Sequence, residues 1–368
     1  MKTLKRDRWF IFIVFFALTL FGLLMIYESS SIYAYKYTQD SSYFFKRQFI
    51  FFIISLIFFF LTLFLDLDFL KRYNKELLLL VIVCLLFLVS FGKSAGGARR
   101  WFNIGGFNIQ PSEFLKVAFL CYCSDYLSRK KNLVRNFKSG ILPMAIVLGI
   151  VCALVILQPD LGTAIFWVLW MILFLFIFGA KIKHLLSGIS IGGLAFFFLI
   201  KLSSYRLARI TSFLNPFSDP KGTGFQLIQS QIAYGSGGFF GVGLGQSRQK
   251  LFFLPASHTD FIYSIIAEEF GLLGSLGILI IFGIVFHKMF VIAKGAIDEF
   301  RAGILWGVLL IFFLEVFINI GVSCGVFPTK GLPLPFISYG GSSLVVHYIL
   351  LALFFNASRK SQEKPFNQ

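Results

Sequence analysis

Apolar stretches recur along most of the chain and alternate with shorter polar segments. A helix that crosses a membrane needs about 20 predominantly apolar residues, because the hydrocarbon core is about 30 Å thick. Several stretches reach that length and the others are somewhat shorter. The pattern predicts an all-α integral membrane protein with about ten transmembrane helices. The expected spans are residues 9–27, 48–65, 77–91, 113–127, 140–157, 161–178, 185–202, 261–286, 302–323 and 338–356.

One long segment, residues 203–260, interrupts this pattern and is rich in Gly, Ser, Pro and Asn. Loops longer than about 15 residues are usually functional or disordered. This segment keeps many Phe and Leu residues, so we expect an ordered outer loop near the membrane rather than a disordered tether. Residues 1–368 are then expected to form a single polytopic membrane domain.

The polar segments between the spans carry clusters of Lys and Arg. Such clusters are enriched in short cytoplasmic loops, so they predict cytoplasmic N- and C-termini and an outer position for residues 203–260. Residues 9–27 are too long and too apolar for the core of a cleaved signal peptide, so we expect a retained anchor. The residues expected on the cytoplasmic side are Lys2, Lys5, Arg6, Arg8, Lys71, Arg72, Lys75, Arg129, Lys130, Lys131, Arg135, Lys138, Lys181, Lys183, Lys288, Lys294, Arg301, Arg359, Lys360 and Lys364.

The overall composition supports a membrane protein and argues against a soluble one. Apolar residues make up 57% of the chain and charged residues 14%, whereas soluble domains carry about 25% charged residues. The net charge of +17 would suggest nucleic-acid binding in a soluble protein. Here the charge follows the membrane topology, so no nucleic-acid partner is expected. The five cysteines lie mostly in apolar stretches and predict neither a disulfide nor a metal site.

A first polar cluster lies between two expected spans. Arg99 and Arg100 precede Trp101, an arrangement that suits a phosphate at the level of the lipid headgroups. A Pro-Ser-Glu motif ending at Glu113 follows, and it also reads as a plain helix start. Lys116 stands three residues after Glu113, so the two side chains can form an ion pair on one helix face.

Two further clusters admit a structural explanation. Asp160 lies in a Gln-Pro-Asp-Leu-Gly-Thr motif, where a tight turn with a capping Asp is the simpler interpretation. Lys330 is the only cation of a proline-rich loop, residues 327–336, which is followed by Ser338. A lysine on an outer loop is commonly a solvated anchor, so the residues leave open whether Lys330 binds a ligand.

The long outer segment contains Arg206 and Arg209, a glycine-rich stretch at 241–245, and then Arg248 and Lys250. The glycine spacing is wrong for a dinucleotide fingerprint, and no strand-helix-strand unit surrounds it. Glycine amides beside cations can form a concavity that binds anions. A merely flexible loop explains the glycines equally well.

Asp260 stands where this segment meets the next apolar stretch, with Glu268 and Glu269 about two turns deeper. A carboxylate at this depth is partly desolvated, which raises its pKa and makes it a better general base. Asp260 could instead cap the helix that follows. His258 and Asp260 could form a metal pair, but two ligands are weak evidence for a metal site.

Taken together, these clusters resemble the SEDS family, the group of FtsW, RodA and SpoVE. The resemblance covers nearly the whole chain and rests on the motifs GARRW, QPSE, QPDLGT, GVGLGQSRQK, LPASHTDFI and PTKGLPLPFISYGGSS. The SRQK and PTKGL segments are most similar to the FtsW group, since RodA-like sequences usually lack the lysine found here as Lys330. One departure is Ala256, where FtsW-like sequences commonly carry an acid.

The resemblance implies a peptidoglycan glycosyltransferase that polymerises lipid II, a disaccharide-peptide on undecaprenyl pyrophosphate, at the division septum of the cytoplasmic (inner) membrane. Asp260 is then the general base, and undecaprenyl pyrophosphate is the leaving group. Cations or a divalent metal ion must offset the charge of that leaving group. Mg²⁺ or Mn²⁺ is therefore a candidate cofactor, with unknown ligands. The candidate substrate-binding residues are Arg99, Arg100, Arg206, Arg209, Lys330, Glu113, His258 and Ser338.

The resemblance also implies partners and leaves alternatives open. A class B penicillin-binding protein is expected to supply the crosslinking, together with other membrane proteins of the divisome and the membrane lipid. The alternatives are a RodA-like polymerase of cell elongation, a lipid II flippase or ion-coupled transporter, and a scaffold without chemistry. A repeat-built carrier would show interrupted helices in matching halves, and no such pair is evident in the sequence. A scaffold leaves Asp260 unexplained.

Overall fold

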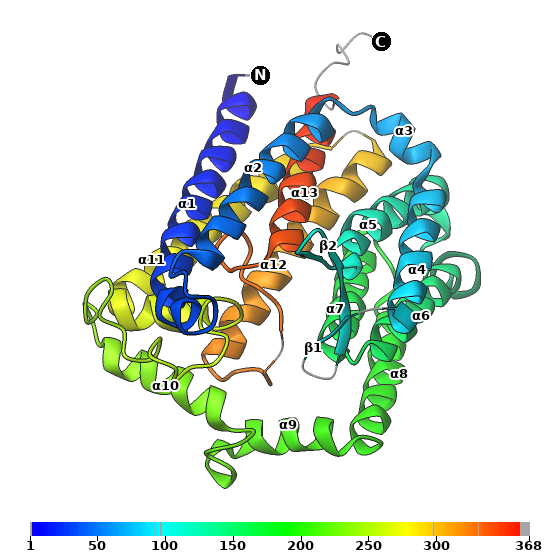
Figure 1. Cartoon of the computed structure of the whole chain (residues 1–368). Coiled ribbons are helices and arrows are strands. Elements are labelled where there is room, and N and C mark those ends of the chain that lie inside the picture. The colour runs from blue at the N-terminus through cyan, green and yellow to red at the C-terminus, as the bar shows by residue number, and fades with distance from the viewer. Residues whose placement is uncertain (1, 92, 96–97, 297, 330, 361–368) are drawn as a thin grey trace.

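The computed structural model describes residues 2–91, 93–95, 98–296, 298–329 and 331–360. Long helices dominate, and the start of α1 and the end of α13 lie at the same end of the bundle, opposite α9 and α10 (Figure 1). The long helices are α1 (Lys2–Thr38), α2 (Tyr43–Phe64), α4 (Asn74–Phe91), α5 (Pro111–Lys130), α6 (Leu142–Leu157), α7 (Leu161–Ile177), α8 (Ile182–Lys201), α11 (Ile262–Lys294), α12 (Glu299–Ser323) and α13 (Gly341–Lys360).

Each of the ten expected spans coincides with one of these helices, so the predicted all-α membrane fold is confirmed. Seven of the described helices are long and apolar enough to cross a membrane: α1, α2, α6 with the turn before it, α8, α11, α12 and α13. Helix α7 is apolar but has 17 residues. Helix α5 carries five charged residues. Whether α5 and α7 also cross the membrane therefore stays a prediction.

Shorter elements connect the long helices. The segment 203–260, expected as an outer loop, contains two helices that run along one edge of the molecule (Figure 1). A small antiparallel sheet of order β1-β2-β3 follows α4, and the sequence pattern did not predict it. The short elements are α3 (Leu67–Arg72), β1 (Lys93–Ala95), β2 (Ala98–Ile104), β3 (Phe107–Ile109), η1 (Lys131–Leu133), η2 (Phe137–Ile141), α9 (Ser204–Leu214), η3 (Pro216–Ser218) and α10 (Phe225–Gly237).

Helices α12 and α13 form the centre of the bundle. The apolar windows of these two helices are 83% and 89% buried inside the protein, whereas that of α8 is only 6% buried. Helix α13 packs most extensively on α2, and α12 packs on α5. The exposed apolar face of α8 must therefore be covered by lipid, whereas α12 offers a rigid position for a polar side chain.

A buried chain of ion pairs links α5, α12 and α13. Lys116 lies 2.6 Å from Glu113 and also pairs with Glu315, which in turn lies 2.8 Å from His347. All four side chains are less than a tenth exposed. Such groups are stable in an apolar interior only when they are paired. This series of ion pairs therefore fixes the three helices in one arrangement.

Helix α11 is broken near its N-terminal end. Gly271 has φ +66°, and the backbone there approaches residues 239–241 closely. Amides of Val242 and Gly243 donate to the carbonyls of Glu268 and Glu269, at 3.0 Å each. The glycine-rich stretch is thus held against the first part of α11, the part that follows Asp260 directly.

Candidate active site

Asp260 lies in the last turn of the loop between α10 and α11, and its side chain is partly buried. Helix α11 has Phe261 at its N-cap position, with no side-chain hydrogen bond at the cap. The capping role considered for Asp260 is therefore wrong. Within the described part of the chain, no group donates a hydrogen bond to this carboxylate. Among the described residues, the fold therefore leaves the oxygens of this acid available.

Two loops meet at Asp260 and are tied together by side chains. Asn319 of α12 donates from Nδ2 to the carbonyl oxygens of Asp260, at 3.0 Å, and Leu332, at 2.7 Å. Ser338 donates from Oγ to the carbonyl of Thr259 at 2.6 Å and accepts from the amide of Leu334 at 2.9 Å. Buried α12 thereby fixes the backbone that carries the carboxylate.

The proline-rich loop passes directly beside the carboxylate. A Cβ atom added to Gly331 would lie 3.4 Å from Oδ2 of Asp260, so the acid faces that backbone. The neighbouring residue, Lys330, lies outside the described residues. Its predicted contact with the leaving group therefore stays a prediction.

Arg100 brings a positive charge to the same site from β2. Its Nε donates to the carbonyl of Gln158 at 3.3 Å, and its Nη2 donates to the carbonyl of Pro159. Its Nη1 lies 3.7 Å from the carboxylate of Asp160. These contacts fix the guanidinium against the turn between α6 and α7, while its charge still acts on Asp260.

Asp160 belongs to this cluster, and it also has the structural role expected from its motif. Its Oδ1 accepts a hydrogen bond from the amide of Thr163 at 3.2 Å and so caps α7. The preceding Gln158 donates to the carbonyl of Leu85 on α4 at 3.2 Å. The turn is therefore a rigid wall of the site, with one carboxylate facing Arg100.

The two arginines of α9 behave differently. Arg209 acts electrostatically on Asp260, and its Nη1 lies 3.4 Å from the carbonyl of Thr329, the residue before Lys330. Arg206 instead donates to the carbonyl of Leu199 at 3.1 Å and so fastens α9 to the end of α8. Of the two, the structure brings Arg209 to Asp260.

The electrostatic surroundings suit Asp260 for proton transfer. Burial raises the pKa of its carboxyl to about 7 against the lowering effect of Arg100, with a further raising effect from Asp160 and a lowering one from Arg209. A carboxyl with a pKa near the working pH is ionised often enough to accept a proton and basic enough to hold it. The geometry therefore fits a general base.

Three other candidate residues have structural contacts. The ring of His258 packs against Tyr33, Phe44 and Tyr339, and burial lowers the pKa of its imidazole to about 4. Ser338 fixes the loop beside Asp260, as described above, and both roles of its hydroxyl are used. Glu113 pairs with Lys116 on α5, as the sequence spacing allowed. Each can shape the site through these contacts.

The side chain of Arg99 lies outside the described residues, as does all of Lys330. Backbone pairing places Arg99 opposite Ser94 in the small sheet, next to Arg100. The substrate-binding roles expected for both residues stay predictions.

The deeper acids, Glu268 and Glu269, hold the glycine-rich loop in place. Glu268 accepts from the hydroxyl of Ser247 and from the amide of Arg248, the latter at 3.1 Å. Glu269 pairs with Lys250 at 3.1 Å. The amides of Gly241 and Gly243 and the ammonium of Lys250 are thus occupied by protein groups, which disfavours the anion-binding concavity considered for this loop.

The described residues contain no group of three or more His, Cys, Asp or Glu side chains placed to hold one metal ion. Asp160 and Asp260 act on each other electrostatically, and Asp160 already faces Arg100. Two carboxylates are a partial ligand set for Mg²⁺, which usually completes its shell with water and substrate phosphates. A divalent cation stays a prediction, and no step below depends on it.

Comparisons with known proteins agree on one family. The family model described as "Cell cycle protein" (FTSW_RODA_SPOVE) matches residues 8–363. A relative from Trichlorobacter lovleyi, named "Probable peptidoglycan glycosyltransferase FtsW", is 40% identical over 93% of this chain and 90% of its own length. Stage V sporulation protein E of Bacillus subtilis is 40% identical over 98% of this chain and 99% of its own length.

Solved structures show the same architecture. One, described as "Structural coordination of polymerization and crosslinking by a peptidoglycan synthase complex", aligns with a TM-score of 0.79 and 29% identity over 97% of this chain and 98% of that chain. The rod shape determining protein RodA of Thermus thermophilus aligns with a TM-score of 0.69 and 25% identity, over the same shares of the two chains. The similarity thus extends over the whole bundle.

Proposed function

The chain belongs to the FtsW/RodA/SpoVE family, and we propose that it is a peptidoglycan glycosyltransferase that polymerises lipid II with Asp260 as its general base. One observation carries the assignment of the base. Asp260 is a partly buried carboxylate that no described group engages by hydrogen bonding, and the pKa of its carboxyl is raised to about 7. A carboxylate to which no described group donates a hydrogen bond is available for substrate.

The proposed reaction is a displacement at the anomeric carbon of the donor sugar. The carboxylate of Asp260 takes the proton of the acceptor hydroxyl, and the freed oxygen attacks that carbon. The bond between the carbon and the pyrophosphate oxygen breaks, and undecaprenyl pyrophosphate leaves with the bonding electrons. A new glycosidic bond lengthens the glycan strand by one disaccharide.

Negative charge develops on the pyrophosphate as that bond breaks. Cations held in place beforehand stabilise such charge, because they need no reorganisation during the reaction. We assign this role to Arg100 and Arg209, which already act electrostatically on Asp260. Arg100 is positioned by the carbonyls of Gln158 and Pro159. Arg99 and Lys330 are proposed to add to the same field.

The cellular setting follows from the same family. The chain is a multi-pass membrane protein, and we propose the cytoplasmic membrane and the division septum as its location, with both termini in the cytoplasm. A structural neighbour belongs to a complex described as coordinating polymerization and crosslinking. We therefore propose a class B penicillin-binding protein as the partner of this chain, alongside other divisome membrane proteins.

The test is polymerisation of labelled lipid II by the purified full chain and by its Asp260→Asn variant. Asn is nearly the same size as Asp but cannot accept the proton. We expect the variant to lose at least about 100-fold in rate, the lower end of what a general base contributes. Asp298→Asn is the matched control, because Asp298 caps α12 far from the site and Asn can also cap.

Three results would contradict the proposal. Polymerisation by Asp260→Asn at the normal rate would show that Asp260 is not the general base. Transfer of lipid II across vesicle membranes without polymer would indicate a flippase, and neither activity, with the partner present, would indicate a scaffold. An equal loss in Asp298→Asn would show that the assay reports general damage.

A further inference from the structure

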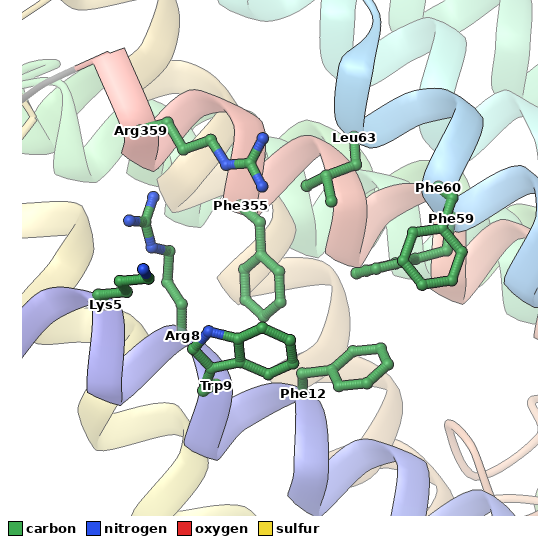
Figure 2. Close-up of a pocket in the computed structure, with 9 residues that line it drawn as sticks. All are labelled: Lys5, Arg8, Trp9, Phe12, Phe59, Phe60, Leu63, Phe355 and Arg359. Carbon is green, nitrogen blue, oxygen red and sulfur yellow. The ribbon is translucent and has the colours of Figure 1, made fainter.

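A cavity of about 220 Å³ lies between the N-terminal part of α1, the C-terminal part of α2 and the end of α13. It sits at the end of the bundle where both termini emerge, opposite α9 and α10 (Figure 1). Figure 2 shows the residues that line it: Lys5, Arg8, Trp9, Phe12, Phe59, Phe60, Leu63, Phe355 and Arg359. None of them belongs to the site around Asp260.

One side of the cavity is strongly basic. In Figure 2 the side chains of Lys5, Arg8 and Arg359 gather on that side. The guanidinium groups of Arg8 and Arg359 are close enough to repel each other electrostatically. Like charges held together in a fold cost free energy unless an anion lies between them. The arrangement thus points to a negatively charged ligand.

Protein groups do not supply that negative charge within the described residues. Nη1 of Arg8 is buried and has no hydrogen-bond partner there. The adjacent acid, Asp7, pairs with Lys288 at 2.5 Å. The guanidinium of Arg359 stacks over the ring of Phe64 at 5.8 Å, a contact that leaves its N–H groups available. A buried unpartnered donor usually has a ligand or water that completes it.

The other side of the cavity is apolar and reaches the membrane. Phe59, Leu63 and Phe355 are buried, whereas Trp9 is 59% and Phe60 51% exposed. Helix α1 is a candidate membrane span from Leu4 onward, so the cavity lies where a span meets the headgroup layer. Aromatic residues at that depth, next to Arg and Lys, are typical of contacts with phospholipid.

We propose that this cavity binds one anionic phospholipid. Its phosphate lies between Arg8 and Arg359, with Lys5 beside it, and the first part of an acyl chain follows the aromatic wall toward Phe60 and Trp9. The rest of the lipid remains in the bilayer, because the cavity is too small to enclose it. The lipid joins α1, α2 and α13 at the end opposite the catalytic site, so this binding is independent of the proposed reaction.

The experiment measures lipid binding to the detergent-solubilised full chain by native mass spectrometry. Phosphatidylglycerol is the probe, and phosphatidylcholine with the same acyl chains is its zwitterionic counterpart. We expect one phosphatidylglycerol to bind at least about tenfold more tightly than phosphatidylcholine, because both lipids present a phosphate but the choline cation of phosphatidylcholine is repelled by Lys5, Arg8 and Arg359. Arg8→Gln with Arg359→Gln should remove this preference.

The matched control is Arg72→Gln with Lys75→Gln, which removes the same charge from exposed positions outside the cavity. It should keep the preference for phosphatidylglycerol. Arg359 is exposed near the end of α13, so the single Arg359→Gln variant serves if the double variant does not fold.

Several outcomes would overturn the proposal. These are equal binding of the two lipids by the unaltered chain, an undiminished preference in the Arg8/Arg359 variant, and an equal loss in the control. Displacement of phosphatidylglycerol by an equal concentration of inorganic phosphate would show a simple anion site instead of a lipid site.

Discussion

Two aspartates of this site stand at boundaries between a loop and a helix, and the fold uses them in opposite ways. Asp160 caps α7 by accepting a hydrogen bond from the amide of Thr163, so it supports the structure. Asp260 caps nothing, and burial raises the pKa of its carboxyl to about 7. An acid whose ionised form is disfavoured costs stability at neutral pH, and such residues concentrate at functional sites.

The raised pKa of Asp260 predicts the pH dependence of activity. Only the ionised carboxylate accepts a proton, so kcat/KM should rise about tenfold per pH unit below about 7 and level off above it. The measurement is the rate of lipid II polymerisation by purified protein over that range. A flat profile across pH 6 to 8 would contradict the role of Asp260 or its raised pKa.

The same shift has a consequence for stability with a definite sign. The folded state holds the Asp260 proton more tightly than the unfolded state, so stability falls as pH rises from about 4 to about 7. Asp260→Asn has no carboxyl group that titrates in this range. Its melting temperature should therefore rise relative to that of the unaltered chain as pH increases through that window. A lower melting temperature for the variant at pH 8 would show that the carboxylate supports the fold.

The sequence predicts only some of the roles that residues have in this site. Asp260 was identified because a lone acid at the mouth of an apolar span is unusual. No local pattern in the sequence shows that Asn319 reaches the carbonyls of Asp260 and Leu332. Its role depends on tertiary packing of α12. Asp160 was interpreted as a turn residue, which is correct but omits its place beside Arg100.

The difference from FtsW-like sequences at Ala256, where an acid is expected, has a conformational explanation. Ala256 has φ +57°, a region that Asp and Asn enter more readily than Ala. The acid that FtsW-like sequences carry at this position can thus serve the backbone of the loop before Asp260. The amides of Thr259 and Phe261 both donate to the carbonyl of Ala256, which keeps the turn closed in this chain.

At the scale of elements, the apolar stretches predicted the long helices well, because lipid forces an apolar segment to satisfy its backbone by helix formation. The polar segments were harder. Helices α9 and α10 lie within residues 203–260, where glycine and polar residues hide the helical pattern. The sheet of β1, β2 and β3 depends on pairing between short strands, which periodicity cannot reveal over three residues.

The break in α11 is the element on which the site's loop depends. At Gly271 the helix takes φ +66°, and an added Cβ would lie 2.3 Å from the amide nitrogen of Gly241. Gly277, less than two turns further along the same helix, has open space around it. One helix therefore contains a glycine that the fold requires and one that it does not.

Gly271→Ala should destabilise the protein by more than about 2 kcal/mol, because it adds left-handed strain of 1–2 kcal/mol to a backbone clash. Gly277→Ala is the matched control and should be neutral or slightly stabilising, since Ala is the better helix former. Thermal unfolding in one detergent compares the two. Equal melting temperatures would show that the break in α11 is not required.

At the scale of the whole molecule, the positions of basic residues distinguish the two ends of the bundle. The basic segments predicted to be cytoplasmic lie together: Lys131 pairs with Glu299, and Lys71 lies over the ring of Phe300 at 5.7 Å. Both termini emerge at one end, while α9 and α10 lie at the other (Figure 1). This arrangement is what an even number of crossings with basic loops inside would produce.

This arrangement predicts which loops reach the outside of the cell. Ser218, exposed in the turn after α9, should be extracytoplasmic, and Asn132, exposed in the basic segment after α5, should be cytoplasmic. Each position would be changed to Cys in a background that lacks the five native cysteines. An impermeant thiol reagent added to intact cells with a permeable wall should label Ser218→Cys only, and lysis should expose Asn132→Cys. The reverse labelling would place Asp260 on the cytoplasmic side, where a polymerase of the outer wall could not use it.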